Sequence, residues 1–180
     1  MKDIILTGPK HSGKTSAGKA LAALCSCDFI DIDELISRRT GKSPRQLFSE
    51  SPAIFQKAEA EAAALAGTDS AEGQRVIAAG GGIIDNPDAV AALKKTGVIA
   101  YLSISVGSAW ERIANSADGE LPPFLKTENP QETHRLLHER RAAAYLHLAN
   151  IVIEAGGKTP EEIAVEILGR VTDVTGANSN

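Results

Sequence analysis

The residues with the clearest chemistry lie near the start of the chain. The segment 8–15 fills every fixed position of the pattern G-x-x-x-x-G-K-[ST]. Its glycines let backbone N–H groups turn inward around a phosphate, and the positive end of a following helix adds to the attraction. Lys14 would reach the β- and γ-phosphates of ATP, and the Thr15 hydroxyl would ligate Mg²⁺. The predicted cradle comprises Gly8, Pro9, Lys10, His11, Ser12, Gly13, Lys14, Thr15 and Ser16.

Two carboxylates follow the second predicted strand. Asp31 and Asp33 would face the same side of an extended chain, at the sheet edge where ligands bind. One acid could hold Mg²⁺ through water, while the other accepts the proton of an attacking hydroxyl. The alternative is that Asp33 caps the helix that follows. The phosphate pattern one strand away favours a role in catalysis.

A scaffold of alternating strands and helices must position these groups. Short apolar runs predict strands at 3–7, 29–31, 75–79, 98–102 and 150–154. Helix formers and caps predict helices at 14–24, 33–39, 44–49, 53–65, 87–95, 106–114, 132–145 and from Pro160 onward. This order predicts one α/β domain, a parallel sheet with helices on both faces.

Length and composition narrow the class of protein. The 180 residues fit a single domain, which we place at 1–172 with a disordered tail at 173–180. The net charge of −4 argues against a general nucleic-acid binder, and no apolar run is long enough to span a membrane. The N-terminus lacks a signal-peptide pattern, and Cys25 and Cys27 are expected to be reduced thiols. We expect a cytoplasmic monomer.

The third predicted strand ends in Gly80, Gly81 and Gly82. Many P-loop proteins that hydrolyse a nucleotide place an acid at this strand end, and none is present here. Three glycines let a ligand lie against bare backbone. We therefore interpret them as a binding surface.

Together these residues resemble the shikimate kinases, in the nucleoside-monophosphate-kinase-like branch of P-loop proteins. The likeness runs from about Ile4 to Leu168 and adds three patterns to those above: T-G-K-S at 40–43, F-x-x-x-E at 55–59 and R-x-x-x-Y at 141–145. It implies a P-loop NTPase fold, with strand order 2-3-1-4-5 and a mobile lid at about 115–130. It also implies transfer of the ATP γ-phosphoryl to the 3-hydroxyl of shikimate, for aromatic amino acid biosynthesis.

The resemblance also implies roles for individual residues. Asp33 would bind the acceptor and serve as base, Asp31 would help hold Mg²⁺, and Arg141 would grip the acceptor carboxylate. Arg112 and Pro160 match positions that sandwich adenine. The implied acceptor site comprises Asp33, Phe48, Phe55, Gln56, Gly80, Gly81, Gly82 and Arg141.

Three positions depart from the family pattern. Gln56 stands where the family carries an arginine that clamps the acceptor carboxylate. The predicted lid has no arginine between Asn115 and Pro130, and His11 replaces a small residue. Losing one charge-assisted pair in a closed site costs about 2–5 kcal/mol. Candidate replacement cations are Arg45, Lys57 and Lys126.

Two other functions stay open at this point. Gln56 and the arginine-free lid favour a kinase for another small hydroxy acid, such as homoserine or gluconate. Turnover of shikimate would argue against it. The second alternative is an ATP-binding regulator without catalysis, which the intact Lys14, Thr15, Asp31 and Asp33 disfavour. ATP binding without transfer to any acceptor would support it.

Charged residues outside these patterns are interpreted as structural. His134 and His138 have a spacing that can ligate a metal, but a solvated helix face is favoured. Arg140 is expected to be a surface ion-pair partner, because adjacent helical residues point about 100° apart.

Overall fold

A five-stranded parallel sheet forms the centre of the protein, in the order β2-β3-β1-β4-β5. The computed structural model describes residues 2–68, 73–115 and 121–176. The strands are β1 (Asp3–Thr7), β2 (Asp28–Asp31), β3 (Arg75–Ala78), β4 (Gly97–Ser103) and β5 (Ile151–Glu154). The predicted fold class and strand order are therefore confirmed.

Strand β1 occupies the middle of the sheet because its side chains are apolar on both faces. Every residue of β1 is buried, and Ile5 pairs in register with Ile77 of β3 and Ile99 of β4. Ile4 and Leu6 point to one face and Ile5 to the other, each into a separate hydrophobic cluster. The sheet thus holds the loop that follows β1 at the centre of its carboxyl edge.

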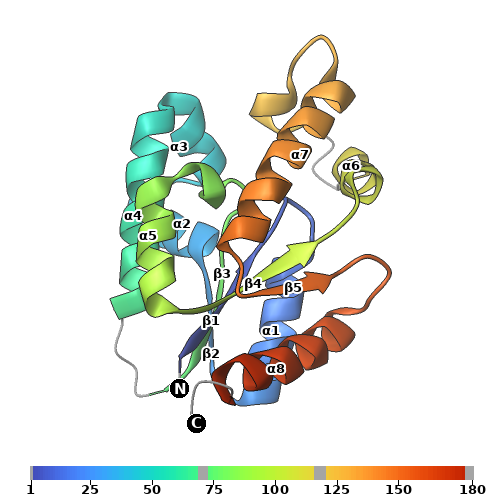
Figure 1. Cartoon of the computed structure of the whole chain (residues 1–180). Coiled ribbons are helices and arrows are strands. Elements are labelled where there is room, and N and C mark those ends of the chain that lie inside the picture. The colour runs from blue at the N-terminus through green and yellow to red at the C-terminus, as the bar shows by residue number, and fades with distance from the viewer. Residues whose placement is uncertain (1, 69–72, 116–120, 177–180) are drawn as a thin grey trace.

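Helices cover both faces of the sheet, as Figure 1 shows. On one face α1 (Lys14–Cys25) and α8 (Pro160–Gly176) pack on Ile4 and Leu6. On the other face lie α2 (Ile32–Thr40), α3 (Pro44–Glu50), α4 (Pro52–Thr68) and α5 (Pro87–Thr96). This three-layer arrangement is the one that the alternating pattern predicts.

The remaining elements stand at the carboxyl edge of the sheet. They are α6 (Val106–Ala114), α7 (Pro130–Leu148) and two short 3-10 helices, η1 (Ile83–Asp85) and η2 (Pro123–Leu125). In Figure 1, α3 on one side and the outer half of α7 on the other rise above the strand ends.

Three sequence-based boundaries need correction or comment. Helix α7 begins at Pro130, because the Asn129 side chain accepts a hydrogen bond from the N–H of Glu132. The tail predicted from residue 173 is wrong for 173–176, which complete α8. Residues 116–120 of the predicted lid and 177–180 of the predicted tail lie outside the described residues.

No helix within residues 2–68, 73–115 and 121–176 combines the length and the apolar character that crossing a membrane requires.

Candidate active site

The loop between β1 and α1 is shaped by glycine. Gly8 has a φ of +141°, and a Cβ atom there would lie 2.5 Å from the carbonyl oxygen of Leu102. Gly13, with a φ of +93°, begins the turn into α1. Both conformations strain any other residue. The two glycines therefore determine the shape of this loop. It lies at the carboxyl edge of the sheet and leads into the N-terminus of α1.

Lys14 lies inside this loop. Its Nζ donates to the carbonyl oxygens of Gly8 at 3.0 Å and Pro9 at 2.7 Å. Burial lowers the pKa of Lys14 to about 8, although the carboxylates of Asp33 and Asp31 oppose the shift. The amine is therefore still mainly charged at neutral pH and can neutralise phosphate charge.

Asp31 links the end of β2 to α1. Its Oδ2 accepts a hydrogen bond of 2.9 Å from the Thr15 hydroxyl. Its Oδ1 caps α2, accepting from the N–H groups of Asp33 at 3.0 Å and Glu34 at 3.3 Å. The cap considered for Asp33 is therefore made by Asp31. Oxygen atoms of a hydroxyl and a carboxylate side by side are the ligand types that Mg²⁺ prefers, so this pair fits the ion.

Asp33 lies in the first turn of α2 instead of on an extended strand end. The chain becomes helical directly after Asp31, so the geometry expected for an extended pair is wrong. Both carboxylates nevertheless reach the same cavity. Desolvation by neighbouring groups, and then the nearby Asp31, raise the pKa of Asp33 above the ordinary aspartate value. The side chain is still accessible to solvent, and the raised pKa makes it a better proton acceptor.

The cavity between these groups has a volume of about 670 Å³. That volume is in the range of small-molecule sites. Its lining comes from the phosphate loop, both acids, the end of β3 and helix α6: Lys10, His11, Gly13, Lys14, Thr15, Ser16, Asp31, Asp33, Ala79, Gly80, Gly81, Glu111, Arg112 and Asn115.

The triple glycine packs directly on the phosphate loop. A Cβ at Gly81 would lie 2.7 Å from the backbone nitrogen of Lys10, which only glycine avoids. A Cβ at Gly80 would lie 3.0 Å from Oδ1 of Asp33. The segment therefore brings bare backbone beside both the loop and the acid. Its role as a binding surface remains a prediction.

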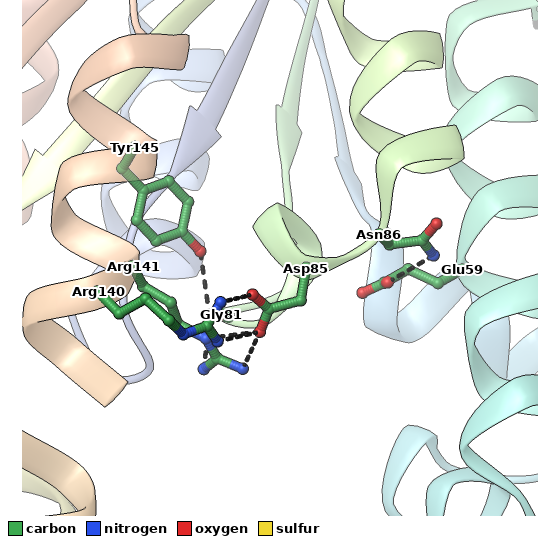
Figure 2. A network of polar contacts seen from close by, with 7 residues as sticks. All are labelled: Glu59, Gly81, Asp85, Asn86, Arg140, Arg141 and Tyr145. Carbon is green, nitrogen blue, oxygen red and sulfur yellow. Dashed lines mark hydrogen bonds and ion pairs between the residues drawn. The ribbon is translucent and has the colours of Figure 1, made fainter. Parts of the chain in front are cut away.

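Arg141 reaches the far end of the triple glycine from α7 (Figure 2). Its Nη2 and Nε donate to Oδ2 of Asp85 at 2.7 and 2.9 Å, and its Nη1 donates to the carbonyl oxygen of Gly81 at 3.3 Å. The Tyr145 hydroxyl donates to the same carbonyl at 3.1 Å. The guanidinium lies 5.7 Å from the centre of the Phe124 ring. The predicted acceptor arginine is thus beside the predicted binding surface, already paired with a carboxylate.

Glu59 is a buried acid next to this surface, with 1% of its surface exposed. Its Oε2 accepts from Nδ2 of Asn86 at 2.9 Å, as Figure 2 shows, whereas Oε1 has no hydrogen-bond partner among the described residues. A Cβ at Gly80 would lie 3.4 Å from Oε1. Burial raises the pKa of Glu59 to about 7, and the hydrogen bond from Asn86 only partly opposes this.

Three predicted acceptor-site residues, Phe48, Phe55 and Gln56, do not line the cavity. The rings of Phe48 and Phe55 meet edge to face at 6.0 Å, and neither lines the cavity. Gln56 is exposed, and its backbone oxygen accepts from Nδ2 of Asn86 at 2.8 Å. Their acceptor roles remain predictions.

The two predicted adenine residues differ in position. Arg112 lines the cavity and donates to the carbonyl oxygen of His11 at 2.7 Å, so it borders the phosphate loop. Pro160, the first residue of α8, is not among the described residues that line the cavity. The structure therefore brings Arg112 to the site and does not bring Pro160 there.

The candidate replacement cations do not line the cavity either. Arg45, Lys57 and Lys126 are all exposed, and Lys57 lies 4.0 Å from the Glu61 carboxylate. Sequence reasoning missed Asp85 altogether. It belongs to no pattern, and its contacts with α7 join residues far apart in the chain.

The histidine pair on α7 is buried, which corrects the expected solvated face. His134 is 5% exposed and His138 8% exposed, and the rings of Trp110 and His134 lie 5.6 Å apart. Burial lowers the pKa of both histidines, so they are neutral packing residues between α6 and α7.

This chain is similar to shikimate kinases in both sequence and structure. The family model described as shikimate kinase matches residues 10–172. A shikimate kinase of Thermodesulfovibrio yellowstonii is 36% identical over 169 residues, which span 93% of this chain and 94% of the relative. A shikimate kinase of Caldanaerobacter subterraneus is 35% identical over 93% of this chain and 95% of its own. The solved shikimate kinase from Acinetobacter baumannii in complex with shikimate matches with a TM-score of 0.85 and 29% identity, over 96% of this chain and 94% of that one.

Proposed function

The chain belongs to the shikimate kinase family, and we propose that it transfers the γ-phosphoryl group of ATP to the 3-hydroxyl of shikimate. One observation carries the proposal: the phosphate loop, the candidate Mg²⁺ pair and Asp33 line one cavity with Gly80 and Gly81, and Arg141 contacts Gly81. A kinase needs these groups together, because it positions two substrates and neutralises charge.

The nucleotide side is formed by the phosphate loop and α1. Backbone N–H groups of the loop and the N-terminus of α1 would hold the phosphates, and Lys14 would leave its carbonyl partners for the β- and γ-phosphates. Thr15 and Asp31 would hold Mg²⁺. That ion, when bound, supplies positive charge beside the phosphate oxygens. Arg112 borders the place where the nucleoside would lie.

Asp33 would act on the acceptor. Its carboxylate takes the proton of the attacking hydroxyl, whose oxygen forms a bond to the γ-phosphorus. The bond from the γ-phosphorus to the bridging oxygen breaks, and ADP leaves with that electron pair. The position of Asp33 between Lys14 and Gly80 supports this role, and so does its raised pKa.

Backbone of the triple glycine and the Arg141 guanidinium would bind the acceptor ring and its carboxylate. Phe48, Phe55 and Gln56 would complete the site from α3 and α4. We also propose that the protein acts as a monomer.

The two alternative functions, a kinase for another hydroxy acid and an ATP-binding regulator without catalysis, fit the site less well. A kinase for homoserine or gluconate would explain Gln56, but the relatives from Thermodesulfovibrio yellowstonii and Caldanaerobacter subterraneus, which are 36% and 35% identical to this chain, are shikimate kinases. A silent regulator would not need Asp33 and Lys14 to share one cavity with the triple glycine.

A panel of acceptors tests the proposal. ADP release with Mg-ATP should depend on shikimate and stay near the acceptor-free rate with homoserine and gluconate. A response to another acceptor alone would favour the first rival. ATP binding without acceptor-dependent ADP release would favour the second.

A further inference from the structure

The carboxylate of Asp85 is shared by two adjacent arginines of α7. Arg140 donates from Nη1 to Oδ1 at 2.8 Å and from Nη2 to Oδ2 at 3.1 Å. Arg141 donates to Oδ2 from both Nε and Nη2. Figure 2 shows the two guanidinium groups converging on this one side chain. Such charge-assisted contacts are the strongest hydrogen bonds that arginine forms.

This convergence is unusual for neighbouring positions on a helix. Consecutive side chains leave a helix about 100° apart, so Arg140 would ordinarily point into solvent. Its side chain remains 61% exposed, yet its guanidinium reaches the 29% exposed Asp85. The expected ion pair of Arg140 is confirmed, and its partner lies at the edge of the candidate site.

The cluster sits at the end of the triple glycine. A Cβ at Gly82 would lie 3.3 Å from Nη2 of Arg141, and the Gly81 carbonyl accepts from Nη1 of the same residue. Gly80, at the other end of the segment, borders Asp33. A small ring compound placed with a hydroxyl at Asp33 would therefore direct a second substituent toward the two arginines.

The charge of the cluster favours an anion. Two guanidinium groups and one carboxylate leave one uncompensated positive charge. Asp85 stays ionised because hydrogen bonds from Arg140 and Arg141 lower its pKa, overcoming the opposite effect of burial. A carboxylate held across two arginines is also the arrangement that an acceptor carboxylate would need.

Position 56 and the segment 115–130 lack the arginines that the family uses. We propose that Arg140 is a second acceptor-binding arginine, and that Asp85 is an internal counter-ion which the acceptor carboxylate displaces from Arg140 and Arg141. This inference rests on the proposed function, because it assigns the carboxylate of the same acceptor. Asp85 thereby becomes a specificity-determining residue, since only an acceptor with a well-placed anion can replace it.

The proposal predicts opposite effects at the two ends of the ion pair. Removing Arg140 takes away a cation that the acceptor needs, so acceptor affinity falls. Removing the charge of Asp85 removes a competitor, so acceptor affinity rises. A purely structural tie between η1 and α7 predicts weaker acceptor binding in both variants, through loss of order around Arg141.

The experiment compares Arg140→Met and Asp85→Asn with the wild type. Arg135→Met is the matched control, because Arg135 is an ion-paired arginine on the same helix, bound to Glu132 and Glu139. The readouts are KM for shikimate, KM for ATP and the calorimetric Kd of shikimate in the presence of ADP. We expect KM and Kd for shikimate to rise about tenfold in Arg140→Met and to fall severalfold in Asp85→Asn. KM for ATP and the values of the control should stay unchanged.

Two results overturn the inference while the proposed function stands: an unchanged shikimate KM in Arg140→Met, or a raised one in Asp85→Asn. Arg140→Lys should recover part of the affinity if charge matters. If the wild type neither binds nor phosphorylates shikimate, the proposed function fails by itself. The inference is then decided by Asp85→Asn, in which a gain of shikimate binding supports it and no gain overturns it.

Discussion

The Thr15 hydroxyl and Oδ2 of Asp31 lie 2.9 Å apart, joined by a hydrogen bond between the first turn of α1 and the end of β2. The same aspartate uses Oδ1 to cap α2. One side chain therefore positions both the metal ligand pair and the helix that carries Asp33. This coupling makes the candidate Mg²⁺ pair a rigid part of the fold.

The substitution Asp31→Asn should separate these two tasks. Asparagine caps helices as well as aspartate, so the melting temperature should change little. Loss of the negative charge should raise the Mg²⁺ concentration that gives half-maximal ADP release by at least about fivefold. Asp28→Asn, at the exposed start of β2, is the control. An unchanged Mg²⁺ requirement would remove Asp31 from the metal site.

The substitution Asp33→Asn should remove the proton acceptor and leave nucleotide binding intact. We expect kcat to fall by about 10²–10⁴, the usual contribution of a general base. Kd for ADP, measured by calorimetry, should stay within about twofold, because the phosphate loop is untouched. A variant that retains a tenth or more of wild-type kcat would show that Asp33 is not the base.

Glu59 should make stability depend on pH. Its folded pKa is about 7, above the ordinary value of 4.5. Between these values the folded state holds a proton that the unfolded state releases, so stability is greatest at low pH and falls as the pH rises through about 7. Glu59→Gln should lack this loss. Between pH 5 and pH 8 the free energy of unfolding of the wild type should fall by up to about 3 kcal/mol more than that of Glu59→Gln. This magnitude follows because a shift of one pKa unit corresponds to about 1.4 kcal/mol.

Urea denaturation of both proteins at the two pH values measures this difference. Glu61→Gln is the control, because Glu61 lies on the same helix and is 57% exposed. It should show no comparable change with pH. Parallel pH dependence of the wild type and Glu59→Gln would show that Glu59 titrates normally.

Lys14 should make nucleotide binding sensitive to alkaline pH. Its pKa in the free protein is about 8, and bound phosphates would raise it by stabilising the charged amine. Affinity for ADP should therefore fall roughly tenfold for each pH unit above about 8. Lys14→Met should bind ADP weakly at every pH, with no such slope. Constant affinity of the wild type from about pH 7 to 9.5 would contradict a titrating lysine.

The parts of the fold that sequence predicted are those that strong local patterns specify. The apolar run of β1, the glycines at 8 and 13 and the proline at the start of α5 each leave the backbone few alternatives. The pattern around Lys14 and the two acids located the site for the same reason. Strand order came from family resemblance, because local patterns do not define which strands pair.

The parts that sequence missed depend on long-range packing. Asp85 and Arg140 are separated by 55 positions, and no spacing rule links them. Asp31, and not Asp33, caps α2, because α2 begins directly after β2. His134 packs against Trp110 of α6, and the pattern of α7 alone does not reveal that His134 and His138 are buried.

We propose that the γ-phosphoryl group passes from ATP to shikimate in this cavity. The most direct measurement uses ATP with a radioactive γ-phosphoryl group, incubated with Mg²⁺, shikimate and the protein, followed by separation of the products. We expect label in a phosphorylated shikimate, in an amount equal to the ADP formed, and none with Asp33→Asn over the same time. Label that remains in ATP, or appears only as inorganic phosphate, would contradict it.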